Sequence, residues 1–121
     1  MNVALWAGVL VIGGLGSVAR FMVDRAVARR ASGAFPVGTL TVNISGALLL
    51  GLVTGLTLSH GAALLVGTAL LGAYTTFSTW MLETQRLAEE RRIWPAVVNI
   101  VLSVVLGLAA AAAGQWIASL L

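Results

Sequence analysis

The sequence predicts an all-α membrane protein with four transmembrane helices, and three observations support this. Of the 121 residues, 60% are hydrophobic and only 9% are charged, which is too little charge to keep a soluble domain of this size dispersed. The hydrophobic residues gather into four runs of about 20 residues, the length that crosses a hydrocarbon core of roughly 30 Å. All seven basic residues are arginines, and they lie between these runs or near their ends.

The four expected spans cover residues 3–22, 36–58, 62–82 and 94–121. Pro36 suits the first turn of the second span, because the N–H that proline lacks has no helical partner there. A tight turn is expected at residues 59–61, where His60 is exposed and solvated, and a charged, amphipathic connection is expected at residues 83–92. Residues 1–121 are therefore expected to form a single four-helix transmembrane unit.

The arginines also predict the orientation in the membrane. They all fall within residues 20–30 and 86–92, whereas both ends of the chain and the 59–61 turn carry none. The positive-inside rule then places the arginine-bearing connections in the cytoplasm and both termini outside, in a multi-pass protein of the cell's inner (plasma) membrane. Because these membrane flanks account for the net charge of +3, no nucleic-acid partner is expected.

The composition argues against most enzyme and metal chemistry. The absence of Cys excludes disulfides, zinc fingers and thiol catalysis. One His and four acidic residues are too few for most metal sites, and they form no catalytic triad, carboxylate pair or phosphate loop. We therefore do not expect an enzyme.

The densest polar group inside a span lies in the third one, after Gly72. Five hydroxyl-bearing residues occupy six positions there: Tyr74, Thr75, Thr76, Ser78 and Thr79. One interpretation is a helix broken at mid-membrane, whose freed backbone groups face protein or water and coordinate an ion. The other is an unbroken helix whose hydroxyls bond to carbonyls four residues back. The spacing alone leaves both open.

Other polar residues of the spans also allow two interpretations. Asn43 in the second span is expected to face a pore or to join two helices, the commoner use of such a residue. Asn99 and Ser103 share one helical face in the fourth span and either extend a polar track or join helices. Arg20 either reaches the membrane interface or binds a substrate, the first being favoured. Glu83 is a candidate ion-pair partner for Arg20 or for Arg86.

Over essentially its whole length the sequence resembles the small bacterial fluoride channels. The motifs that carry the resemblance are residues 13–20, residues 38–43 with Asn43, and residues 72–79 followed by Glu83. The third-span motif together with the Asn43 motif is specific for this family, whereas the glycines alone are not. The resemblance implies passive, fluoride-selective efflux that lowers cytoplasmic fluoride and protects against its toxicity.

The resemblance also implies an assembly and its sites. The assembly is a dimer of two antiparallel subunits in the lipid bilayer, with two narrow fluoride pores at their interface. A structural Na⁺ is implied at the dimer's centre, bound by the backbone carbonyls of Gly72 and Thr75. Structural or charge roles are assigned to Arg20 and Glu83. The pore residues carried over by motif position are Asn43, Phe77, Thr79 and Ser103.

Three positions depart from the family pattern. Trp80 stands where the family has a second Phe, Gly107 where it has a second Ser, and Ala73 where it has a Gly. The first two changes remove expected pore groups. Together with the one-sided arginines they favour a heterodimer with a paired homologue of opposite charge bias, and a homodimer remains the alternative.

Two other functions were weighed against the fluoride channel. A small proton-coupled multidrug exporter needs an acidic residue deep in the membrane, and no Asp or Glu lies inside an expected span. A non-transporting structural subunit would not require a broken polar helix.

Overall fold

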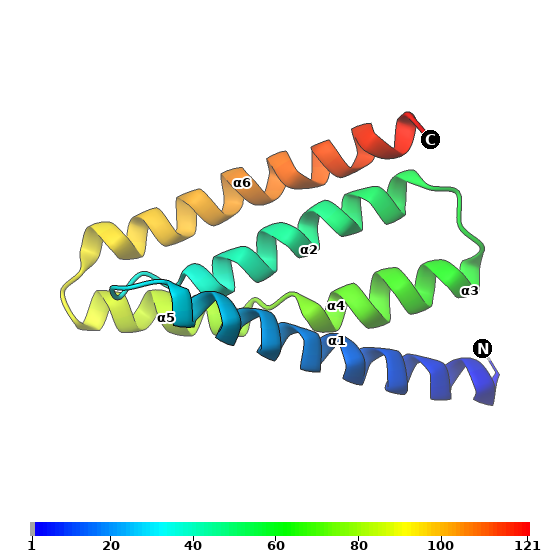
Figure 1. Ribbon diagram of the computed structural model, residues 1–121, viewed down its shortest axis with the longest axis horizontal. Coiled ribbons are helices and arrows are strands. Elements are labelled where there is room, and N and C mark those ends of the chain that lie inside the picture. Colours follow the sequence, from blue (N-terminus) through cyan, green and yellow to red (C-terminus); the bar gives the residue numbers. More distant parts are fainter. Residues whose placement is uncertain (1) are drawn as a thin grey trace.

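The computed structural model describes residues 2–121 and contains helices but no strand within that range (Figure 1). Four helical stretches are long and apolar enough to cross a membrane, the stretch His60–Glu89 counting as one. This confirms the predicted four-span fold. The elements are α1 (Val3–Arg30), α2 (Val37–Gly55), α3 (His60–Ala63), the π-helix η1 (Leu64–Leu71), α4 (Gly72–Tyr74), α5 (Ser78–Glu89) and α6 (Ile93–Ser119).

Several helix ends differ from the predicted span limits. α1 is capped by Asn2, whose Oδ1 accepts a hydrogen bond from the Leu5 N–H at 2.8 Å, and it continues to Arg30. The residues beyond position 22 were expected to form a polar connection. They are helical because Ala and Arg are good helix formers and because arginines in the last turn interact favourably with the helix dipole. The expected connection at 83–92 is likewise mostly helix, since α5 ends at Glu89.

α2 and α6 form the closest helix pair in the molecule. They pack together more extensively than any other two elements. A Cβ atom added at Gly51 would overlap the backbone of Ala111, and one added at Gly114 would overlap the backbone of Leu48. In lipid, such small residues let helix backbones approach closely, and this packing drives association. The close approach of α2 and α6 therefore depends on glycine at these two positions.

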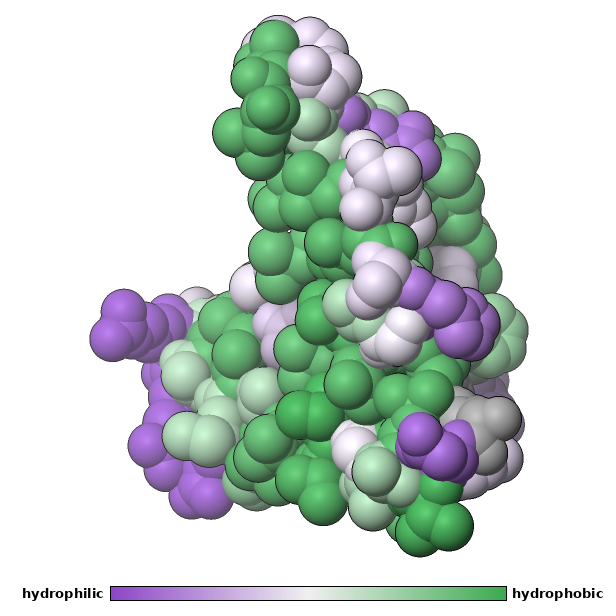
Figure 2. Space-filling view, turned by 90° about the vertical axis from the view of Figure 1, so that its right-hand side faces the viewer, coloured by the Kyte–Doolittle hydropathy of each residue, from purple (hydrophilic) through white to green (hydrophobic). Residues whose placement is uncertain are grey.

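The two ends of the bundle differ in charge. Both termini lie at one end, and the connections that follow α1 and α5 lie at the other (Figure 1). Since the arginines belong to α1, α5 and the connection after α5, the second end carries the basic residues. Figure 2 looks along the bundle onto the end that carries the termini, and most of the surface that it shows is apolar. Large apolar side chains, such as Leu10 on α1 and Val105 on α6, are also exposed along the helices. This surface is that of a multi-pass membrane protein.

A broken helix and a polar cavity in the third span

The third span is interrupted between α4 and α5. Thr75 has extended backbone angles, φ −79° and ψ 161°, and residues 75–77 are not helical. The broken-helix interpretation is therefore confirmed, although the Thr75 hydroxyl also donates to the Leu71 carbonyl at 3.0 Å, as the other interpretation expected. The π-helix that precedes the break was not predicted, because no sequence signal distinguishes Leu64–Leu71 from an α-helix.

Asn43 on α2 holds the break in place. Its Nδ2 donates to the Thr76 carbonyl, and the Thr76 N–H donates to its Oδ1, both at 2.8 Å. Thr76 is only 8% exposed, so its backbone N–H and C=O need hydrogen-bond partners. The Asn43 amide binds both and thus replaces the two partners that a continuous helix would supply. Asn43 therefore joins two helices, and the second hydrogen on its Nδ2 remains available as a donor.

This arrangement frees two backbone carbonyls. In a continuous helix the Thr76 N–H would bond to the Gly72 carbonyl, and the Thr79 N–H would bond to the Thr75 carbonyl. Instead, the Thr76 N–H donates to Asn43, and the Thr79 N–H donates to the Thr76 Oγ1 at 3.2 Å. Gly72 and Thr75 are the two residues whose carbonyls the sequence resemblance implies as sodium ligands, and a donor set of this kind fits a monovalent cation.

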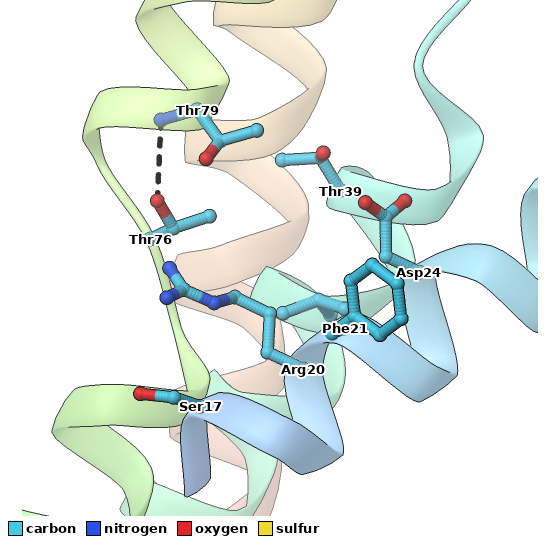
Figure 3. A pocket seen from close by; sticks show the side chains of 8 residues that line it. Ser17, Arg20, Phe21, Asp24, Thr39, Thr76 and Thr79 are labelled. Carbon is cyan, nitrogen blue, oxygen red and sulfur yellow. Dashed lines mark hydrogen bonds between the residues drawn. The ribbon is translucent and has the colours of Figure 1, made fainter. Parts of the chain in front are cut away.

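A polar cavity of about 240 Å³ lies beside the break, between α1, α2 and the start of α5 (Figure 3). Figure 3 shows Arg20 extending toward Thr76, while Asp24 and Thr39 lie near each other across the cavity. The lining residues are Ser17, Arg20, Phe21, Asp24, Thr39, Val42, Thr76 and Thr79. The cavity thus combines one guanidinium and one carboxylate with four hydroxyl groups.

The expected pairing of Glu83 with Arg20 or Arg86 is wrong. Within residues 2–121 the one ion pair joins Arg92 and Glu90, with 3.9 Å between Nε and Oε2. One carboxylate oxygen of Glu83, Oε1, is buried without a hydrogen-bond partner. Because Glu83 lies on α5, which is fixed by its packing on α6, the sequence could not reveal which arginines its side chain would reach.

The residues predicted for the pore do not all gather in this cavity. Thr79 lines it, and Asn43 binds the backbone of the lining residue Thr76. Phe77 is 70% exposed on the outside of the chain. Ser103 lies on α6, and its Oγ is buried without a partner. One chain therefore brings together only part of the predicted pore.

Asn99 is buried between α5 and α6. It is 1% exposed, and its Nδ2 donates to the Thr84 Oγ1 at 2.8 Å. The interpretation that it joins two helices is therefore confirmed. Asp24 also lines the cavity, although its charge indicates a connection and not a helix that crosses the membrane. Its position four residues after Arg20, and hence on the same face of α1, was the available signal.

Comparison with known proteins identifies the family. The model of the family described as CrcB-like protein, Camphor Resistance (CrcB), matches residues 7–115. The chain is 66% identical over 120 residues to "Fluoride-specific ion channel FluC 2" of Mycobacterium tuberculosis, covering 99% of this chain and 95% of the relative. It is 68% identical over 119 residues to the FluC 2 of Mycolicibacterium paratuberculosis, covering 98% of each.

A more distant relative carries a different number in its name. "Fluoride-specific ion channel FluC 1" of Leifsonia xyli subsp. xyli is 42% identical over 116 residues, which cover 93% of this chain and 85% of the relative. These matches confirm the resemblance found in the sequence. The chain belongs to the CrcB-like family.

Proposed function

We propose that this chain is a subunit of a channel that conducts fluoride passively and thereby lowers cytoplasmic fluoride. The observation that carries the proposal is the polar cavity at the mid-span break. Fluoride is a small, strongly hydrated anion, so a pathway for it must offer donors that replace its water. Hydroxyls, amides and a guanidinium are such donors, and the relatives that match nearly the whole chain are named fluoride-specific ion channels.

Passive conduction is sufficient for this task. HF crosses membranes as a neutral acid and dissociates in a less acidic cytoplasm, which traps fluoride there. In the plasma membrane, the potential supplies about 2.3 kcal/mol per charge per 100 mV and drives the anion outward. The mechanism needs neither a catalytic step nor ATP. The cavity volume of about 240 Å³ is far above the roughly 30 Å³ that one water occupies in the liquid.

Fluoride efflux from liposomes tests the proposal. Vesicles that contain the purified protein, with its partner subunit if one is required, and potassium fluoride should release fluoride when a potassium ionophore supplies the countercharge. Vesicles without protein should retain it, and vesicles loaded with chloride should retain chloride. A fluoride electrode records the release. Equal release of chloride, or fluoride release that needs a proton gradient, would contradict a selective passive channel; the second result would favour a proton-coupled transporter.

The channel that we propose is an antiparallel dimer with its pores at the interface. One expected pore residue supports this, because Phe77 is 70% exposed and is therefore open to a second subunit. A second subunit would complete a lining that also includes Asn43 and Thr79. The subunit faces available for this contact are apolar, as Leu10 and Val105 illustrate.

We also propose the structural Na⁺ at the centre of this dimer. Two antiparallel breaks that meet there would surround one cation with the freed carbonyls of Gly72 and Thr75. Neutral carbonyl oxygens, without a carboxylate, suit a monovalent ion better than a divalent one. When bound, the ion would offset the repulsion between carbonyl dipoles that face one another.

The arginine distribution bears on the partner. The arginines lie in the second half of α1, in α5 and in the connection after α5, so the chain is expected to insert mainly in one orientation, with both termini outside. An antiparallel dimer would then need a paired homologue whose basic residues lie at the opposite end. The numbers 1 and 2 in the relatives' names are consistent with such pairs.

A C-terminal reporter in cells that express this chain alone tests the heterodimer proposal. We expect the reporter to be found only outside, because the arginine-bearing end is retained in the cytoplasm. Moving several arginines to the opposite end by substitution should reverse the location and provides the control. An even distribution between the two sides would contradict the heterodimer and support an antiparallel homodimer.

A further inference from the structure

We infer that Asn99 and Thr84 are positioning residues that fix the orientation of Trp80 and, through it, of Phe77. In this arrangement Trp80 is a rigid side chain beside the fluoride pathway, and its indole N–H does not donate to the anion. The inference rests on the proposed fluoride channel.

A closed network of hydrogen bonds connects α5 with α6 at these residues. The Trp80 Nε1 donates to the Asn99 backbone carbonyl at 3.2 Å. The Asn99 Nδ2 donates to the Thr84 Oγ1, and the Thr84 hydroxyl donates to the Trp80 backbone carbonyl, both at 2.8 Å. Each of the three residues thus binds the other two, so none can move independently.

Burial makes this network rigid. Asn99 is 1% exposed and Thr84 is 8% exposed, so water does not compete for their polar groups. In such surroundings an unpaired donor or acceptor is costly, and satisfied networks define one arrangement. The indole ring of Trp80 has a single donor, and that donor is bound to Asn99. It cannot bind an anion unless the contact with α6 breaks.

Phe77 depends on Trp80 for its orientation. Its ring is 70% exposed, and exposed side chains change rotamer within picoseconds to nanoseconds. The ring meets the Trp80 ring edge to face, with centroids 5.7 Å apart and an angle of 83° between the planes. An aromatic ring is positive at its edge and negative on its face, so the orientation of Phe77 determines whether it attracts or repels an anion.

Substitution of Thr84 in the full-length protein tests this inference with two measurements. Thr84→Val removes the hydroxyl that joins Asn99 to α5 while keeping the shape of the side chain. We expect fluoride efflux to fall about tenfold, a typical size for coupling within one network. In NMR spectra the Trp80 indole N–H, identified by its disappearance in Trp80→Phe, should exchange with solvent faster. Thr84→Ser, which keeps the hydroxyl, should retain the fluoride efflux and the slow indole exchange of the wild type.

A matched control and a double substitution separate positioning from general stability. Thr54 has the same pattern as Thr84, because its hydroxyl donates to the Gly51 carbonyl and accepts from the Gln115 amide on α6. Thr54→Val should therefore change neither measurement. In a Trp80→Phe background, where the indole N–H is absent, Thr84→Val should reduce efflux no further.

Two outcomes would overturn the inference. One is an indole N–H that stays protected in Thr84→Val, and the other is an equal loss of efflux in the wild-type and Trp80→Phe backgrounds. A wild-type protein that releases no fluoride even with its partner subunit present would instead contradict the proposed function, and the indole exchange would still report on the network by itself.

Discussion

Replacing Asn43 with Ala should reduce fluoride efflux by on the order of 100-fold, as expected if two lost hydrogen bonds raise the barrier by about 3 kcal/mol. The Asn43 side chain makes both hydrogen bonds that hold Thr76 in the break. Without it, the Thr76 N–H either returns to the Gly72 carbonyl, which closes the break, or stays buried and unpaired. In both cases the groups that line the cavity change position. The liposome assay measures the effect.

Thr41→Val is the matched control for this substitution. Thr41 lies two residues before Asn43, and its hydroxyl bonds to the Val37 carbonyl within α2, so efflux should remain close to that of the wild type.

The Asn43 variant also tests the proposed sodium site. The melting temperature of the wild type should fall when sodium is replaced by N-methylglucamine, and that of Asn43→Ala should not respond. Normal conduction by a folded, monodisperse Asn43→Ala protein would contradict the role of this residue.

Replacing Arg20 with Gln should reduce fluoride efflux at least tenfold, because the Asp24 carboxylate would then be the one charge of the lining and would lower the local concentration of anions. Arg20 provides the positive charge among the residues that line the cavity, opposite the carboxylate of Asp24. Without the guanidinium, the net charge of the lining becomes negative and repels the anion. Arg20→Lys should retain part of the activity, since it keeps the charge but loses the planar set of donors.

The dependence on ionic strength distinguishes an electrostatic role from a structural one. The ratio of wild-type to Arg20→Gln efflux should shrink as salt is added, because salt screens charges that are accessible to water. Arg29→Gln is the control, since Arg29 is exposed near the end of the same helix and does not line the cavity. A ratio that does not change with salt, or an equal loss in Arg29→Gln, would contradict the proposed role of Arg20.

The fold was predictable from the sequence because lipid imposes strong rules on composition. Long apolar runs and the positions of the arginines predicted the four spans, and the structure confirms them. The hydroxyl cluster after Gly72 left a broken and an unbroken helix open, and the structure shows the broken one. The ends of the helices were less predictable. Residues 24, 25, 29 and 30 are charged, yet α1 continues to Arg30, because a helix does not have to end where the membrane ends.

The site was only partly predictable because its contacts join distant parts of the chain. Nothing near Asn43 in the sequence indicates that its amide binds the backbone of Thr76. The position of Glu83 was predictable, but its lack of an ion-pair partner depends on how α5 lies against α1 and α2. Asp24 was missed because its charge suggested a loop, although its spacing from Arg20 places both on one face.

The close packing of α2 on α6 has a consequence for how the protein is made. Glycines bring these two helices together, yet the whole third span separates them in the sequence. A ribosome therefore delivers α2 to the bilayer long before α6 exists. Until then, lipid tails must cover the surface around Gly51, and later they must be displaced. Assembly of this helix pair thus follows insertion as a separate, second stage, and the cell's insertion machinery must hold an incomplete bundle during synthesis.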